Sequence, residues 1–508
     1  MLKSTFAHWQ KRFAVAGLLP LLSLVAVSQA WAQSEAVPSD APATDELSLD
    51  DLIALARRFN PGLAAGGRAT MAIRAQLGEA QRSWLPTGEL TSLLAPSPKI
   101  KCAPDAYSCI STPDIKDATL KLDGVFTRTQ ITFVQPVYTF GKISAGIDAA
   151  EAGIEASRSR EQGLAAELDL NIRKAYFGFK LAREIESTLK EGLGYVEQAE
   201  AMVQKDLDEG GGNMTITDKL RLQSTRAEVE AQVLEVGRGT QIAQAGLRAL
   251  IGTEGPFTFN IDKAALEKLP VPPRPLAFYE EQARLTRPEV RALDYLVRSR
   301  RKLADLEWAK QLPDLAIVGT ATYAFASSVD NPQNAFANDP YNTLSGGLAA
   351  ALRMPLDFGQ RNARASKALA EAEETAFKRR EALGGIGFEV SKAYIELNEA
   401  SGRIEALGKG EKISRRWLTA IVQKMDLGLA ETREVTDALK SYFTMRAKYL
   451  QAVHDFNVAA AALGRATGSN VAGYSRLKVQ DRDAYRSSAQ DPWPRFCRRT
   501  ISHRIPRV

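Results

Sequence analysis

The most regular pattern in the chain is an alternation of bulky apolar with small or polar residues in its second half. In residues 315–326 the odd positions carry Leu, Ile, Gly, Ala, Tyr and Phe, while the even positions carry Ala, Val and Thr. In residues 344–356 the even positions carry all the leucines. A period of two predicts strands with one apolar face, each about the 9–11 residues that a tilted membrane strand needs. Alone, such strands would rather fit the edge of a soluble β-sandwich.

A weaker version of this pattern occurs in the first half. Its apolar residues are Leu120, Leu122 and Phe126, followed by Ile131 and Phe133. These residues fit one alternating pattern only if the alternation shifts by one residue between Phe126 and Ile131, because the first three are at even positions and the last two at odd positions. The sequence therefore predicts four strands per chain, two in each half.

Each pair of strands is followed by a long segment without strong helix breakers. The segments begin after Gly141 and Gly359 and continue for about 65 residues, which corresponds to roughly 100 Å of helix. A glycine-containing turn at 208–213 or 426–429 follows, and then a shorter returning helix that ends at Gly252 or Gly468. The first long helix contains interior glycines that predict close approach of a neighbouring backbone, because each costs about 1 kcal/mol relative to Ala: Gly146, Gly153, Gly163 and Gly178.

A helix is also predicted before each pair of strands. In the first half, Ser48 can cap it with Asp51 three residues later, and it ends near Trp84 because Pro86 cannot continue it. In the second half the corresponding helix runs from near Phe278 to near Leu312.

The two halves are copies of one unit. Val203, Gln204 and Lys205 recur 219 positions later as Val, Gln and Lys at 422–424, and Thr-Asp at 217–218 recurs at 436–437 with the same offset. Repetition at a nearly constant offset predicts two copies, residues 45–252 and 276–468. A Pro-rich linker, residues 253–275, joins them.

The ends of the chain differ in character from these copies. Residues 1–32 have a basic start, an apolar stretch at 13–27 and a small-x-small site at 30–32, which predicts a signal peptide; a retained membrane anchor is the alternative. Residues 33–44 form a short N-terminal segment, and residues 469–508 a basic tail that we expect to be disordered.

The charge of the chain is concentrated in its ends. The formal net charge is +6, but residues 1–32 contribute +3 and residues 476–508 contribute +6. The body is therefore mildly acidic, near −3, and does not predict nucleic-acid binding, which requires a basic face on the folded part.

Few residues are available for catalysis or cofactor binding. The three histidines are His8, His454 and His503, which are too few and too far apart in sequence to favour histidine-based catalysis or zinc binding. We therefore predict that the protein is not an enzyme and has no cofactor or metal site. Cys102 and Cys109 lie in one Pro- and Ser-rich loop, and in an exported protein we expect them to form a disulfide. Mass spectrometry that finds both thiols free would contradict this pairing. Cys497, in the tail, has no assigned role.

Four strands in one chain require a partner copy. A sheet of four strands has two open edges, which are too costly in lipid, and the smallest single-chain outer-membrane barrels have about eight strands. Chains must therefore share a barrel. Two copies would supply eight strands and three copies twelve, and physical reasoning alone does not choose between them.

Several motifs resemble the outer-membrane efflux protein (TolC) family. They are the stretch 47–56 followed by Phe-Asn-Pro at 59–61, and the two strand-to-helix motifs at 135–141 and 354–359. Their order and spacing cover nearly all of residues 45–468. The resemblance implies a mainly α-helical trimer in which a shared 12-stranded outer-membrane β-barrel continues into a long periplasmic α-helical barrel. It also implies docking to a periplasmic adaptor protein and an inner-membrane pump.

The resemblance also identifies candidate gate residues at the periplasmic mouth. The family's acid-x-x-Asp motif falls on Glu434 and Asp437, and Asp218 occupies the equivalent place in the first copy. Alternatively, these acids complement the dipole at a helix start. The basic partner expected just after the second tip is missing, and Arg433 could replace it.

The helix tips are candidate adaptor contacts, at Gly210 in the first copy and at Gly428 and Leu429 in the second. An ordinary helix-ending glycine turn would look the same. Asp357 is interpreted as a turn residue.

Three functions follow from these observations. The first is an outer-membrane exit duct for small molecules such as drugs or metals. The second is a duct for secreted polypeptides, as in type I secretion. The third is a periplasmic coiled-coil scaffold without a pore, which predicts no amphipathic strands.

Overall fold

The computed structural model describes residues 46–99, 122, 124–210, 214–252, 259–329, 341–426 and 431–469. The sequence predictions for the signal peptide, residues 33–44, the Cys102–Cys109 pair, Gly428, Leu429 and the tail beyond Ser469 lie outside these residues. The chain forms two units. In the smaller one, β1 (Glu46–Leu47) pairs in parallel with β4 (Asn260–Ile261).

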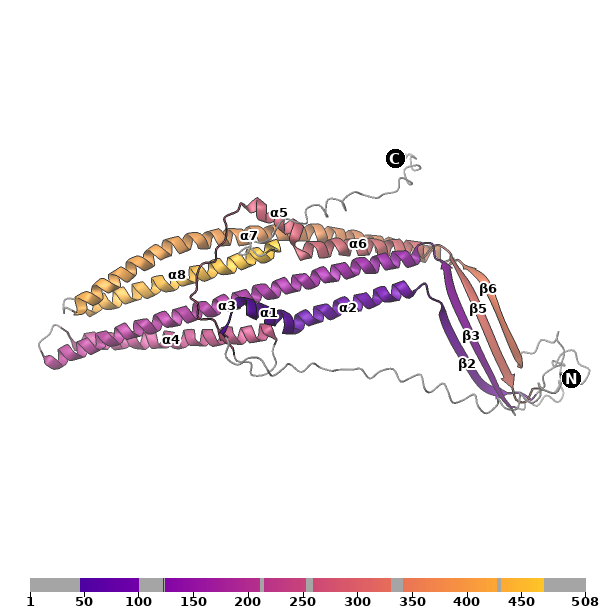
Figure 1. Cartoon of the computed structure of the whole chain (residues 1–508), viewed down its shortest axis with the longest axis horizontal. Helices are drawn as coiled ribbons and strands as arrows, with labels where there is room; N and C mark the ends of the chain where they lie inside the picture. Colours follow the sequence, from indigo (N-terminus) through magenta and orange to yellow (C-terminus); the bar gives the residue numbers. More distant parts are fainter. Residues whose placement is uncertain are drawn as a thin grey trace, which may run out of the picture. The chain divides into compact units, whose positions relative to one another are not determined.

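The larger unit presents the same series of elements twice along the chain (Figure 1). Each series consists of two short helices, two antiparallel strands, a long helix and a shorter returning helix. The first comprises α1 (Leu49–Phe59), α2 (Pro61–Arg82), β2 (Thr87–Ser97), β3 (Gly124–Tyr138), α3 (Lys142–Glu209) and α4 (Ile216–Ile251). The second comprises α5 (Leu276–Thr286), α6 (Pro288–Ala309), β5 (Asp314–Ala326), β6 (Thr343–Arg353), α7 (Phe358–Asp426) and α8 (Thr432–Thr467).

The helix predicted before each pair of strands is in fact two helices. Pro61 and Pro288 each stand at the first position of a new helix, because proline has no N–H to continue the preceding one. The predicted cap is confirmed: Ser48 and Asp51 form a capping box at the start of α1. Asn60 then caps α2 and donates a side-chain hydrogen bond to the carbonyl of Leu250 at 2.7 Å.

The number of strands is as predicted, and they form one antiparallel sheet in the order β2-β3-β5-β6. The apolar residues recognised in the first half lie in or just before β3, however, and the sequence pattern did not locate β2. The strand register shows no shift between Phe126 and Ile131, so the one-residue shift that the sequence pattern required is wrong. Phe126 lies instead on the opposite face of the sheet from Ile131. Its ring centroid is 5.8 Å from that of Tyr341. The irregularity lies instead between Pro136 and Tyr138. Strand β6 ends at Arg353, earlier than predicted, since Pro355 has no N–H for the ladder.

The register aligns the apolar positions of all four strands on one face of the sheet. Leu90 lies opposite Ile131, Phe133 opposite Gly319, and Gly319 opposite Leu348. Many of the large side chains on this face are exposed in the single chain: Leu90, Leu94, Ile131, Ile317, Tyr323, Phe325, Leu344, Leu348 and Leu352. The other face carries mostly small or polar residues, among them Glu89, Arg128, Gln130, Thr132, Thr320, Thr322, Ser345 and Arg353. The sheet therefore has one apolar and one polar face.

A tight turn joins the sheet to the first long helix. Phe140 has a positive φ of 48° and Gly141, the N-cap of α3, has a φ of 87°, a conformation that favours glycine. Lys142 then donates hydrogen bonds to the carboxylate of Asp314 at 2.7 Å and to the Leu312 carbonyl at 2.8 Å. The first turn of α3 is thereby fixed to the start of β5.

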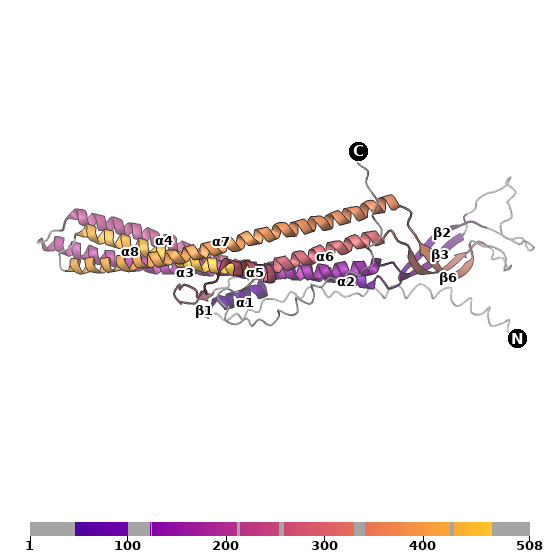
Figure 2. The ribbon, with the colours of Figure 1, turned by 90° about the horizontal axis from the view of Figure 1, so that it is seen from above.

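The two long helices have the predicted length, with 68 residues in α3 and 69 in α7. Near the sheet, α3 packs between α2 and α6; further along, it packs between α4 and α8. Figure 1 shows α7 along one edge of this helical layer and α2 and α4 along the other, and Figure 2 shows the layer from above. Among the described residues, no helix combines the length and apolar character needed to span a bilayer.

The interior glycines of α3 do not show the predicted close approach of a neighbouring backbone within one chain. A Cβ on Gly153 or Gly163 would meet side chains of α2 or α6 at 3.5 Å or more, an ordinary van der Waals distance. Gly146 and Gly178 have open space around that position within one chain, so the prediction is wrong for them there.

Candidate functional site at the helix tips

The turn between α3 and α4 lies against the start of α8. Asp206, in the last turn of α3, accepts a hydrogen bond from the backbone N–H of Met214 at 3.1 Å. The hydroxyl of Thr432, the first residue of α8, lies 3.6 Å from the sulfur of Met214. Gly210 ends α3 with a φ of 67°, and its N–H donates to the Asp206 carbonyl, so the helix-ending turn predicted there is present.

A hydrophobic cluster lies behind these contacts and joins all four helices. Its members come from α3, α4, α7 and α8: Val196, Ala199, Val203, Leu222, Leu418, Ile421, Met425, Val435, Ala438, Leu439 and Tyr442. Val196, Val203, Leu222 and Val435 are at most 1% exposed. Burial of these side chains fixes the ends of the four helices relative to one another.

Asp218 is a capping residue of α4. Its carboxylate accepts hydrogen bonds from the backbone N–H of Thr215 at 3.0 Å and from the Thr215 hydroxyl at 2.6 Å, and the Thr215 hydroxyl accepts the N–H of Asp218. The hydroxyl of Thr215 is the main cause that lowers the pKa of Asp218; Arg221 and Thr432 lower it further, against the effect of partial burial. These hydrogen bonds support the alternative interpretation of Asp218, in which it stabilises the start of a helix.

The two candidate gate acids of the second copy point outward from α8. Glu434 and Asp437 are both exposed, as is Glu431 at the N-cap position, whose side chain makes no capping hydrogen bond. The guanidinium Nε of Arg433 lies 3.9 Å from Asp437 Oδ2 on the same helix. With exposures of 77% and 59%, this pair neutralises Asp437 only weakly.

The helix starts alter which acids correspond between the copies. Asp218 is the third residue of α4, and Glu434 is the third residue of α8, whereas Asp437 is the sixth. The constant sequence offset matched Asp218 with Asp437 because it could not locate where each helix begins. It also missed Glu431, which adds a third acid at a spacing of three residues.

We expect Asp218→Ala to fray the first turn of α4, because it removes the carboxylate that accepts the N–H and the hydroxyl of Thr215 and leaves only the hydrogen bond from the backbone N–H of residue 218 to the Thr215 hydroxyl. The loss should be about 0.5–1.5 kcal/mol, the net contribution of a typical hydrogen bond, and should be seen as faster amide hydrogen exchange in residues 214–222. Since the pKa of Asp218 is lowered in the folded protein, its contribution to stability is present above its unfolded pKa and disappears as the pH falls through the lowered folded pKa. Asp437→Ala is the control and should leave this exchange unchanged. Equal exchange in both variants would contradict the capping role.

The described residues offer little for other chemistry. They contain no group of three or more His, Cys, Asp or Glu side chains placed to hold a metal ion. His454 Nδ1 lies 3.0 Å from Asp455, which is also bonded by Arg403 at 2.9 Å and by Gln451. The carboxylate of Asp357, the residue before α7, accepts a hydrogen bond from the Nε of Arg361 at 2.6 Å, and the turn role of Asp357 stays a prediction.

Comparison with known proteins places this architecture in a class of channel proteins. The outer membrane efflux protein family matches residues 123–253 and 280–469, more than half of the chain, and the chain belongs to this family. A comparison with curated proteins gave no match. The predicted family resemblance is confirmed.

Solved structures of such channels share the fold. The outer-membrane channel OprN has a TM-score of 0.65 and 16% identity, with 84% of this chain and 90% of that chain covered. CusC has a TM-score of 0.66 and 16% identity, with 83% and 92% covered. The MtrE outer membrane channel of Neisseria gonorrhoeae, in its open state, has a TM-score of 0.65 and 18% identity, with 83% and 89% covered.

Proposed function

We propose that the protein is an outer-membrane exit duct for small molecules, formed by three copies of the chain. The observation that carries this proposal is the two-faced, four-stranded sheet. Its exposed leucine and aromatic side chains suit lipid, and its Thr, Gln and Arg side chains suit a water-filled lumen. The pore-free scaffold does not require such a sheet.

The edges of the layer support assembly into a ring. Within the described part of one chain, β2 and β6 each pair with one other strand, so each leaves a ladder of N–H and C=O groups unpaired. The edge at β2 continues into α2, and the edge at β6 continues into α7. The β6 edge of one copy can pair with the β2 edge of the next copy. This contact is head-to-tail, so all edge strands are paired only when the copies form a closed ring. Three copies would supply the twelve strands that the family resemblance implies.

The helical part would form the periplasmic section of the duct. At about 1.5 Å per residue, the 68 residues of α3 would extend it by roughly 100 Å from the membrane. The tips at Gly210 and around Gly428 would meet the periplasmic adaptor protein, which connects the duct to an inner-membrane pump. Glu434 and Asp437, with Asp218 nearby, would line the mouth. The N-terminal residues 1–32 would direct export and be removed.

Small molecules such as drugs or metals are the proposed cargo, and secreted polypeptides are the alternative. A strain that lacks the gene separates the two. Increased sensitivity to toxic compounds, restored by the intact gene, supports efflux. Unchanged sensitivity together with loss of a secreted polypeptide supports the secretion duct.

The assembly is tested most simply by its mass. The mature chain, extracted from the outer-membrane fraction in mild detergent, should have the mass of a trimer after the detergent contribution is subtracted. The edge strands explain this result, because one copy cannot satisfy their backbone groups in lipid. A stable, folded monomer in lipid, or recovery only from the soluble periplasmic fraction, would overturn the proposal.

A further inference from the structure

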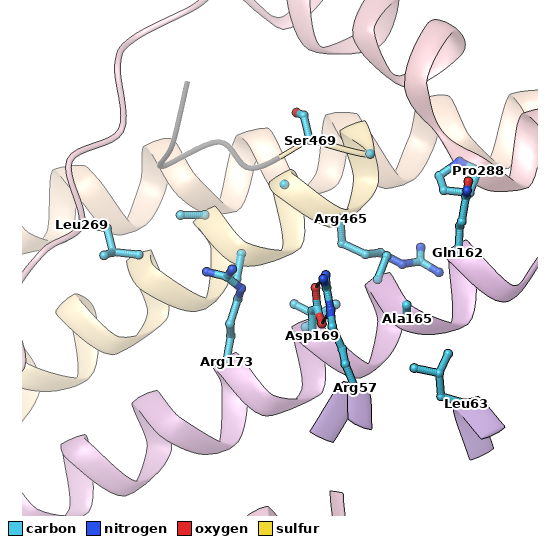
Figure 3. A pocket seen from close by; sticks show the side chains of 16 residues that line it. Arg57, Leu63, Gln162, Ala165, Asp169, Arg173, Leu269, Pro288, Arg465 and Ser469 are labelled. Carbon is cyan, nitrogen blue, oxygen red and sulfur yellow. Dashed lines mark hydrogen bonds and ion pairs between the residues drawn. The ribbon is translucent and has the colours of Figure 1, made fainter. Parts of the chain in front are cut away.

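A pocket of about 510 Å³ lies between α1, the start of α2, α3 and the end of α8 (Figure 3). It is separate in sequence from the acidic tips, since its α3 residues belong to the stretch 162–173 and its α8 residues to 460–465. Its volume is in the range that binds drug-sized molecules. Much of its wall is apolar, formed by Leu63, Leu170 and several alanines.

Two of the three arginines around this pocket have anionic partners. Arg57 binds Asp169 through two parallel hydrogen bonds, Nε to Oδ1 at 3.0 Å and Nη2 to Oδ2 at 2.5 Å. Arg465 lies within 3.3 Å of three glutamates, on α3, α6 and α7. The charge of Asp169, the acidic residue of the pocket wall, is therefore already neutralised by Arg57. The charge of Arg465 is likewise already paired with the nearby glutamates.

Arg173 is different. It makes no hydrogen bond or ion pair with any other residue that the structure describes, although its side chain is half-buried. Figure 3 shows this side chain extending from α3 toward α8, beside the Arg57–Asp169 pair. None of the guanidinium nitrogens of Arg173 is a buried atom without a partner, so the group is open to water and can exchange that water for an anion through charge-assisted hydrogen bonds.

We propose that this pocket binds a small amphipathic anion, a molecule with an apolar body and one carboxylate or sulfonate group. Arg173 receives the anionic group through its planar pair of N–H donors, which match a carboxylate in geometry. The apolar body lies along the wall formed by Leu63, Leu170 and Ala461. Every residue that lines this site belongs to one chain, so the lining itself does not require the proposed assembly.

Binding of 4-phenylbutyrate and of its neutral analogue 4-phenylbutanol tests this site. The full mature protein would be reconstituted in lipid nanodiscs and titrated by calorimetry. The acid should bind at least tenfold more tightly than the alcohol. Arg173→Gln should remove this preference, and Arg173→Lys should retain part of it. Arg160→Gln changes an exposed arginine of α3 outside the pocket and should have no effect.

A second variant tests the apolar wall. Ala461→Leu should weaken both ligands by filling the pocket, while assembly mass and thermal unfolding confirm that the protein is intact. Equal affinity for acid and alcohol would overturn the proposal. So would the same affinity in the wild type and Arg173→Gln, or no binding to the assembled protein because a neighbouring copy fills the site.

Discussion

Leu348→Arg is expected to abolish accumulation of folded protein in the outer membrane. Leu348 lies in the middle of β6 on the apolar face of the sheet and is 74% exposed in the single chain. An arginine on the lipid face near the bilayer midplane costs about 2–4 kcal/mol, and every copy of the assembly would carry it. Quantitative immunoblotting of outer-membrane fractions, with the trimer band in mild detergent as the second readout, measures the effect.

The adjacent residue provides the matched control. Ala349 lies opposite Val318 on the other face of the sheet, which already carries Arg128 and Arg353. Ala349→Arg should therefore leave the amount of trimer nearly unchanged, because the side chain reaches water. If Ala349→Arg were the damaging change and Leu348→Arg the tolerated one, the faces would be assigned the wrong way round. Equal effects of the two variants would contradict a membrane role for the sheet.

Neutralising the candidate gate acids should reduce the cation selectivity of the channel by roughly an order of magnitude. Three copies would gather Glu434 and Asp437 around one narrow mouth, and rings of acidic side chains favour cations. The double variant Glu434→Gln with Asp437→Asn should shift the reversal potential in a salt gradient toward zero. It should also weaken block by multivalent cations added from the periplasmic side.

The single variants and a distant control sharpen this test. Glu434→Gln should have the larger effect of the two, because the charge of Asp437 is partly offset by Arg433 at 3.9 Å. Glu235→Gln on α4, a 73% exposed carboxylate some 19 residues from the start of that helix, should change neither quantity. If the acids only complement the start of α8, their neutralisation would cost about 0.3–1 kcal/mol of stability and leave selectivity unaltered. That outcome would remove both residues from the gate.

Much of the fold could be predicted because strong local signals coincide with it. The alternation in residues 315–326 and 344–356 located β5 and β6, and the absence of breakers after Gly141 and Gly359 gave helices of nearly the observed length. The terminal glycines Gly252 and Gly468 end α4 and α8 in the left-handed conformation, as expected for helix C-termini.

The errors have separate causes. The break at Pro61 follows from the rule that was applied at Pro86, since proline cannot continue a helix, and the prediction of one helix did not apply that rule there. Phe126 looked like part of the apolar face, but its ring packs against Tyr341, a residue distant in sequence. The pocket at Arg173 has no sequence signal, because it depends on which arginines find an acidic partner after α1, α3 and α8 come together.

Single-channel recording tests the central proposal most directly. The purified protein, shown to be trimeric, would be inserted into a planar lipid bilayer and its current measured across a range of voltages. A two-faced sheet closed into a barrel predicts discrete, long-lived conductance steps with a preference for cations, and Leu348→Arg protein should give none. The absence of any conductance step from stably inserted, wild-type trimer would contradict the account of this protein as a duct.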